Sequence, residues 1–218
     1  MKIFTLLGIA LLIGSTGCSP MSPTNRVKGS GTVVTEKRPL APFNSLEVNC
    51  FGTIQVRAQG PEGLEISGDD NVVPLITTEV KNSTLYIGAS KGYDPQSKLQ
   101  IVVSTPNLEK LVFAGAGEAD LSNVKNDRVE LVMSGAGRLI ASGETKEADL
   151  TLSGAGAIDA KNLHAEIAKV NSTGAGSVDV YATEQLDANA SGVGSINYYG
   201  SPKIVNKRAG GIGKINQR

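Results

Sequence analysis

The stretch LTLSGAGAIDAKNL, Leu150–Leu163, contains the motif that decides the fold. Gly-Ala-Gly or a close variant occurs six times in the second half of the chain, at intervals of 20, 19, 20, 18 and 19 residues. A phosphate-binding loop occurs once, between a strand and a helix, and no helical pattern follows these copies. We therefore predict that the glycines are structural corners of a repeat. They are Gly115, Gly117, Gly135, Gly137, Gly154, Gly156, Gly174, Gly176, Gly192, Gly194, Gly211 and Gly213.

Apolar and polar residues alternate on both sides of each glycine pair. Leu150 and Leu152 precede the motif and Ile158 follows it, in the period-two pattern of strands with one buried face. The two alternations are out of phase, so the chain is expected to bend at the glycines, which permit the backbone angles of a tight corner. Each unit is then a strand, a glycine corner, a second strand and a polar loop such as Ser122–Arg128 or Ser142–Ala148.

Units of this length that bury only one face cannot stand alone and stack into a solenoid. We predict an all-β fold, a single-stranded right-handed parallel β-helix with about 18–20 residues per turn. A leucine-rich-repeat horseshoe has units of similar length, but its leucine and asparagine pattern and its helical return are not found here. Inner residues shrink from Phe113 and Met133 to Ser172 and Ala190, so the interior is expected to narrow toward the C-terminus.

The N-terminal half of the predicted domain follows a weaker form of the same plan. Leu46 and Val48 alternate before Gly52, and apolar alternation resumes after it. Asp69–Val80 is the only place where a short helical turn is expected, opened by an acidic cap and limited by its proline. No domain boundary is visible, so residues 31–218 are predicted to form one β-helical domain.

The first residues have the layout of a bacterial lipoprotein signal. Met1–Gly14 carries one lysine and then an apolar run that is too short to span a membrane. Ser15–Cys18 resembles the lipobox, in which the cysteine is lipidated and becomes the mature N-terminus, although serine replaces the usual Leu, Val or Ile at its first place. The alternative is an ordinary secretory signal cleaved nearby. We expect residues 1–17 to be the signal peptide.

A lipid on Cys18 would hold the protein on a bilayer without a second membrane element. The Ser- and Pro-rich start of residues 18–30 indicates a flexible tether. Ser19 stands where the inner-membrane retention signal has Asp, which favours the outer membrane. Cys50 is then left alone without a disulfide partner. Basic and acidic residues balance at 21 each, so no electrostatic footprint for nucleic acid is present.

Three segments of the chain carry a family resemblance: SGDDNVVPLITTEVKNSTLYI (67–87), STPNLEKLVFAGAG (104–117) and the repeated Ser-Gly-Ala-Gly. They resemble the head GIN domain family, named as autotransporter adhesin heads and common in lipoproteins of Bacteroidetes and related bacteria. The resemblance covers Leu40–Asn216. It implies a β-helical domain exposed outside the inner membrane, and it brings no activity with it.

Polar residues recur three places past the second glycine of the units, where stacked turns would align them in a column on the outer face. The candidate polar ladder is Asp120, Asp159, Asp179, Asn197 and Asn216, with Ile140 interrupting it. Two carboxylates about 4.8 Å apart repel by only about 1 kcal/mol in water, so neighbouring members can coexist or share a cation. Because the nonapeptide calcium repeat is absent, we expect no metal and no cofactor.

The same column raises the alternative of a polysaccharide-active enzyme of glycosidase or lyase type. Carboxyl groups on adjacent turns would approach the separation of a retaining glycosidase, but nothing marks one of them as buried or raised in pKa. His164, the only histidine, lies in a predicted loop without a metal or catalytic partner. Cys50 is expected to be a small buried side chain. We therefore favour a non-catalytic protein.

The remaining candidates are contact surfaces. Tyr198 is expected to face inward and Tyr199 outward, where its flat ring and hydroxyl suit a glycan or protein ligand. The C-terminal segment KRAGGIGKINQR (207–218) ends on a repeat without a capping helix, so its strand edge is a candidate for self-association. The prediction is an adhesin-like, lipid-anchored protein of the cell envelope that binds a glycan or a protein partner.

Overall fold

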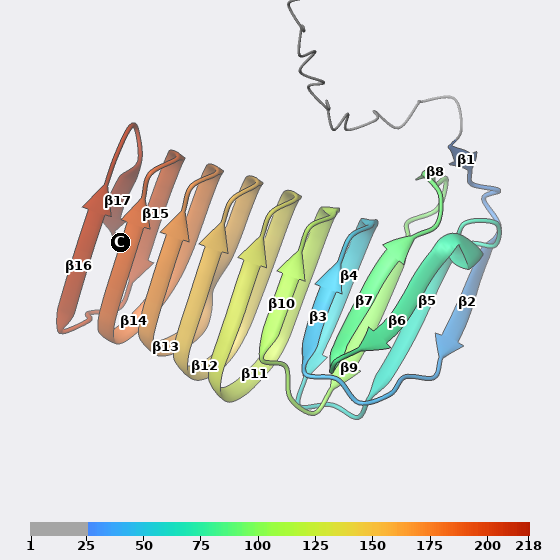
Figure 1. Ribbon diagram of the computed structural model, residues 1–218, viewed down its shortest axis with the longest axis horizontal. Coiled ribbons are helices and arrows are strands. Elements are labelled where there is room, and N and C mark those ends of the chain that lie inside the picture. Colours follow the sequence, from blue (N-terminus) through green and yellow to red (C-terminus); the bar gives the residue numbers. More distant parts are fainter. Residues whose placement is uncertain (1–25) are drawn as a thin grey trace, which may run out of the picture.

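The computed structural model describes residues 26–218, which form a row of stacked coils (Figure 1). A three-residue 3-10 turn, η2, covers Val73–Leu75. The strands are β1 Val27–Lys28, β2 Val33–Arg38, β3 Ser45–Val48, β4 Phe51–Ala58, β5 Gly63–Asp69, β6 Ile76–Lys81, β7 Thr84–Ala89, β8 Tyr93–Asp94, β9 Gln100–Thr105, β10 Lys110–Phe113, β11 Ala116–Met133, β12 Ala136–Leu152, β13 Ala155–Ser172, β14 Ala175–Ala190, β15 Val193–Tyr199, β16 Ile204–Ala209 and β17 Lys214–Gln217.

Consecutive coils pair in parallel with equivalent residues aligned. Leu139 of β12 pairs with Ile158 of β13, which pairs with Val178 of β14. In Figure 1 the front strands rise to the upper edge, and the chain then passes behind and down before the next coil begins. The predicted all-β, right-handed parallel β-helix is confirmed. We call the upper edge, which carries the glycine motifs, the glycine-corner edge, and the opposite one the lower edge.

The polar segments predicted to be loops are strands in the structure. β11 and β12 run without interruption through Ser122–Arg128 and Ser142–Ala148, turning the lower edge at irregularities in register. Asn123 and Gly143 adopt positive φ angles of 61° and 132° there. Inter-coil pairing continues through the bend because it needs only backbone groups, so polar side chains can point to solvent without interrupting the strand.

The core lies between the two walls of the coil and narrows toward the C-terminus as predicted. Phe113 and Met133 are fully buried at the wide end, and Ala190 occupies the corresponding inner position near the narrow end. At the last coil polar groups close the interior. The Lys207 ammonium lies 4.5 Å from the centre of the Tyr198 ring, so a charged side chain covers the end of the core.

The N-terminal end departs from a simple sequence of coils. The strand pair β3 and β4 lies between β7 and β9 on one side and β10 and β11 on the other. After β9 the chain therefore passes over one layer of the stack before it forms β10. The strands β3 and β4, which come earlier in the sequence, occupy that layer. Antiparallel strands then close this end, with β6 on β7 and β5 between β2 and β9.

The predicted helical segment is a short 3-10 turn, and its cap differs from the expectation. Val72 is its N-cap residue and no side chain caps it. Asp69 instead accepts hydrogen bonds from the backbone N–H groups of Gly31 at 3.0 Å, Gln96 at 2.8 Å and Ser97 at 3.2 Å. It is fully buried, and these donors hold the start of the domain against the loop that precedes β9.

Residues 26–30, assigned to the tether from sequence, are held on the domain. β1 pairs in parallel with β8, and the side chain of Asn71 donates to the carbonyl of Lys28 at 2.8 Å. Gly29 is buried. The signal peptide, Cys18 and the tether up to residue 25 lie outside the described residues. Within residues 26–218 there is no helix with the length and apolar character of a membrane span.

Candidate binding surface

The residues of the polar ladder occupy equivalent positions on the outer face of the wall that descends from the glycine corners. Asp120 pairs with Ile140, Ile140 with Asp159, and the pairing continues through Asp179 to Asn197 and Asn216. The amide of Asn197 donates to Asp179 Oδ1 at 2.8 Å, and that of Asn216 donates to Asn197 Oδ1 at 3.1 Å. Amide donors therefore link the C-terminal members.

Asp159 lies deeper than the rest of the ladder. Its side chain is 9% exposed, and its Oδ2 accepts the guanidinium of Arg138 and lies 3.5 Å from Lys161 Nζ. Its Oδ1 is buried with no hydrogen-bond partner among the described residues. Sequence reasoning did not identify either basic partner, although Arg138 stands two places before Ile140, which holds the ladder position in its own coil. Arg138 and Lys161 neutralise the negative charge of Asp159, so this carboxylate does not need a shared metal ion for that purpose.

The glycine motifs allow successive coils to touch through their backbones. A Cβ on Gly135 would lie 2.7 Å from the carbonyl carbon of Ala114 and would overlap the Gly115 oxygen. Gly137 has a φ of 147° and packs in the same way on Gly117. The second glycines at 117, 176 and 194 also have positive φ, and Gly156 has an equally close neighbour. The last motif is looser at its first glycine, because a Cβ on Gly211 would come no closer than 3.6 Å to the Ser191 oxygen.

An aromatic file lies near the lower edge, at the end of the descending wall. His164 pairs with Tyr181, and Tyr181 pairs with Tyr199. The His164 and Tyr181 rings stack with centroids 4.4 Å apart and planes inclined by 19°. The predicted loop around His164 is wrong, because the residue lies on strand β13; its side chain is exposed and rests against an aromatic ring. Tyr198 is buried and Tyr199 half-buried, as expected.

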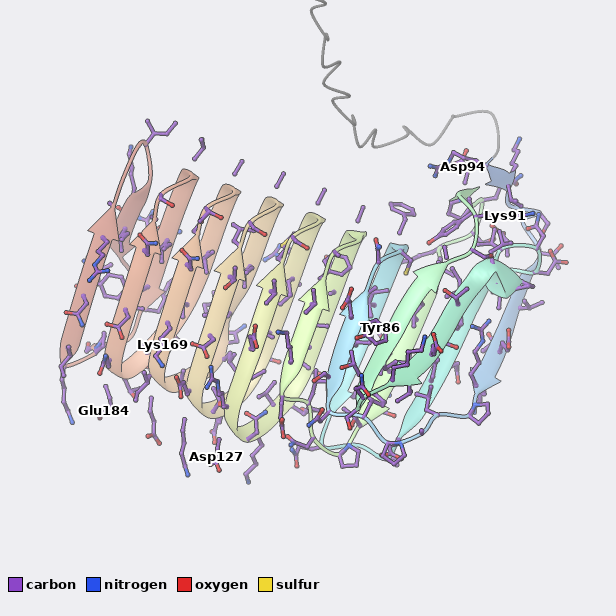
Figure 2. All side chains as sticks on the ribbon, in the orientation of Figure 1. Tyr86, Lys91, Asp94, Asp127, Lys169 and Glu184 are labelled. Atoms are coloured by element: carbon purple, nitrogen blue, oxygen red, sulfur yellow. The ribbon has the colours of Figure 1, made fainter. Side chains whose placement is uncertain are left out.

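The other wall, which rises to the glycine corners, carries interlocking charges. Arg128 contacts Asp149, Glu147 contacts Lys169, and Lys110 lies 2.9 Å from Glu130. The hydrogen bond from Lys169 lowers the pKa of Glu147, and the hydrogen bond from Asn206 lowers that of Asp187. Figure 2 shows Lys169 on this outer face, and Asp127 and Glu184 pointing away from the lower edge.

Four hollows on the described surface are half open or more to solvent. Their volumes run from about 320 to about 620 Å³. One of about 320 Å³ lies at the lower edge beside His164, between Lys146 and Glu166. The carboxyl groups with a shifted pKa, Glu36, Asp69, Glu147 and Asp187, all have it lowered. A glycosidase general acid needs the opposite shift. Residues 26–218 hold no group of three or more His, Cys, Asp or Glu side chains arranged for a metal ion.

The sequence matches a family model described as "Putative auto-transporter adhesin, head GIN domain" over residues 42–202. The chain belongs to the head GIN domain family. No protein with a curated functional description is detectably similar to this head GIN domain protein. Its family and the solved structures below support an adhesin-like, binding role in coarse terms.

Solved structures of proteins from Bacteroides and Parabacteroides share the architecture of this head GIN domain protein. A "putative adhesin" from Bacteroides fragilis is 29% identical, with a TM-score of 0.74 over 88% of this chain and 100% of the other. A "Putative lipid binding protein" from Parabacteroides distasonis is 25% identical, with a TM-score of 0.55 over 88% and 99%. A "putative adhesin" from Parabacteroides merdae, at 21% identity, a TM-score of 0.50 and coverage of 89% and 99%, supports the fold alone.

Proposed function

We propose that this protein is a non-catalytic lipoprotein of the cell envelope, anchored through Cys18 to the outer membrane, whose β-helix binds a glycan or a protein partner. The observation that carries the proposal is the side wall between the glycine corners and the lower edge. It offers aligned amides, carboxylates and aromatic rings at a regular spacing over successive coils. Membership of an adhesin-named family adds support.

A flat, periodic wall suits an extended ligand. Aligned Asp179, Asn197 and Asn216 offer both acceptors and donors to hydroxyl groups or to a peptide backbone. Tyr181 and Tyr199 lie beside them on the same strands and supply flat apolar area with a hydroxyl. The lowered carboxyl pKa values and the open hollows support binding over catalysis.

Ligand binding is tested by screening the purified full-length protein against a glycan array and against envelope proteins. Tyr199→Ala and Asn197→Ala should each weaken a ligand found this way by about tenfold, the loss expected from one buried aromatic or hydrogen-bonding contact. Tyr86→Ala is the matched control, because Tyr86 is a 41% exposed tyrosine on the opposite wall (Figure 2). Equal effects of Tyr86→Ala and Tyr199→Ala would contradict the assignment of the wall. Release of shortened products from a glycan would contradict the non-catalytic function.

Lipidation is tested by counting thiols, since the chain has only two cysteines. Burial raises the pKa of the Cys50 thiol to about 11, so Cys50 should not react with a thiol reagent in the folded protein. A protein lipidated on Cys18 should show no reactive thiol when native and one when denatured. One native and two denatured thiols would contradict the anchor. Cys50→Ser is the control and should remove the thiol seen on denaturation.

Self-association through the C-terminal edge belongs to the same proposal. β16 is exposed along its whole length, and Ile204 and Val205 are 53% and 37% exposed, which leaves a strand edge able to accept another chain. Sedimentation of the purified protein over a wide range of concentrations tests this. A monomer at the highest concentration would contradict it.

A further inference from the structure

The glycine-corner edge presents a file of apolar side chains that the proposed binding wall does not use. In register along the coils these residues are Phe51, Ala116, Ala136, Ala155, Ala175 and Val193, and Ile212 takes the same place in the last motif. We call this file the apolar ridge. Its large members are well exposed, at 49% for Phe51, 56% for Val193 and 67% for Ile212. Figure 2 shows short side chains projecting from this edge along the middle coils.

The ridge is suited to an apolar environment because its backbone is already paired. The N–H of Ala136 donates to the Gly115 carbonyl at 3.0 Å, and the N–H of Ala155 donates to the Gly135 carbonyl at 3.1 Å. The same bond continues along the later coils, so removing water from the edge would leave few backbone groups unsatisfied. The four-residue motifs in this part of the chain contain no charged side chain. They are Ser134–Gly137, Ser153–Gly156, Thr173–Gly176 and Ser191–Gly194.

The lower edge has the opposite character. Lys125, Glu144, Lys146 and Glu166 are exposed along it, and Figure 2 shows Asp127 and Glu184 extending from it. The two edges of each coil therefore differ sharply in polarity. If the only requirement were solubility in water, both edges would be expected to carry polar residues, so the apolar edge needs another explanation.

The described chain begins at the apolar edge. Arg26 precedes β1, which pairs with β8, and both strands lie above the glycine-corner edge at its N-terminal end, beside Lys91 and Asp94 (Figures 1 and 2). Eight residue steps separate Cys18 from Arg26, which span at most about 29 Å. A lipid on Cys18 would therefore keep this edge close to the bilayer. The lower edge lies a further strand length away, about 26 Å for the eight residues of β4.

We infer that the apolar ridge lies on the membrane, so that the β-helix rests along the bilayer surface with its glycine-corner edge in the interface and its lower edge facing away. This inference rests on the proposed lipid anchor. Phe51 near one end and Val193 and Ile212 near the other would enter the interfacial region, while the alanines between them allow the edge to approach closely. The binding wall then stands upright on the membrane and remains open to ligands from the side.

The experiment uses the full-length lipoprotein in vesicles of phosphatidylethanolamine and phosphatidylglycerol that contain doxyl-labelled lipid. Single cysteines carry a bimane label at Ala155→Cys or Val193→Cys on the ridge, with Glu184→Cys on the lower edge as the matched control. Native Cys50 stays in place because it is buried. Doxyl lipid should quench both ridge labels at least twofold more than the control label, because only the ridge reaches the depth of the acyl chains.

Quenching at position 155 or 193 no greater than at position 184 would overturn the inference. Quenching of a Phe51→Cys label without quenching at Val193→Cys would also overturn it, because the β-helix would then stand on its N-terminal end. A ridge label whose emission shifts to the blue without doxyl quenching would mean contact with protein, and that too contradicts a lipid occupant. Protein that does not float with vesicles refutes the anchor itself, whereas floating protein with unquenched ridge labels refutes the ridge alone.

Discussion

Gly135 packs directly on the backbone of Gly115, one coil earlier in the stack, and a Cβ there would lie 2.7 Å from the carbonyl carbon of the adjacent Ala114. We predict that Gly135→Ala lowers the free energy of unfolding by about 1–3 kcal/mol, because the backbone of the neighbouring coil must move to admit the methyl group. Chemical denaturation measures the change. Gly210→Ala, where a Cβ would meet nothing within 4 Å, should change stability by less than about 0.5 kcal/mol. Similar losses at both sites would contradict direct coil contact.

The wide end of the core depends on Phe113. Its side chain is fully buried, whereas Phe51 is 49% exposed. Phe113→Ala should lower the free energy of unfolding by about 3–5 kcal/mol because it leaves a cavity that neighbouring strands cannot fill. Phe51→Ala removes the same atoms from the surface and should cost less than about 0.5 kcal/mol. Equal costs in urea denaturation would show that the coil is not packed as described.

Asp69 should make the N-terminal end sensitive to acid. Burial raises its pKa, but the hydrogen bonds from Ser97, Gln96 and Gly31 outweigh burial and lower it below the ordinary value. A lowered folded-state pKa means that the ionised form stabilises the fold above the unfolded pKa of about 3.9, and this contribution is lost as the pH falls through the folded pKa.

Asp69→Asn should therefore reduce the thermal midpoint at pH 7, and the difference from the unsubstituted protein should shrink as the pH falls below about 4. Hydrogen exchange at Gly31 and Gln96 should accelerate in the variant, because an amide side chain cannot accept all three N–H donors. Asp70→Asn is the neighbouring exposed control. A difference in midpoint that does not depend on pH would rule out the carboxylate as the cause.

Arg138 should contribute more than an ordinary surface cation because its partner is nearly buried. Asp159 is 9% exposed, and its Oδ2 accepts the Arg138 guanidinium. Arg138→Ala should cost about 1.5–3 kcal/mol, the range for a hydrogen bond to a charged group. Lys146→Ala breaks an exposed pair with Asp127 and should cost less than about 1 kcal/mol. Urea denaturation compares the two, and an equal effect would place Asp159 effectively in solvent.

The repeat region could be predicted from the sequence because its rules are local. Each glycine motif interrupts one alternation and begins another, and the stacking of Leu139 on Ile158 follows from the constant spacing. The lower edge was predicted less well. Segments such as Ser142–Ala148 carry the polar composition of loops, but strand pairing needs backbone groups alone, and the bend is made by single residues such as Asn123 and Gly143.

The N-terminal arrangement could not be predicted from local pattern. Leu46 pairs with Leu85 on one side and Leu111 on the other. A leucine would fit the inner face of any coil, so this residue does not indicate which coil its strand belongs to. The role of Asp69 also depends on distant chain, since its donors come from positions 31, 96 and 97. One partner of Asp159 could have been predicted from the sequence, because Lys161 is only two residues away.

The coil made by β3 and β4 lies between neighbours that come later in the chain, and this limits how the molecule can change in length. In the C-terminal half, loss or duplication of one unit from one glycine motif to the next would bring equivalent surfaces together. Deletion of residues 45–58 would instead leave a vacant layer in the stack that no adjacent segment can fill. Longer and shorter relatives should therefore differ in the number of glycine motifs while keeping the first hundred residues nearly constant in length.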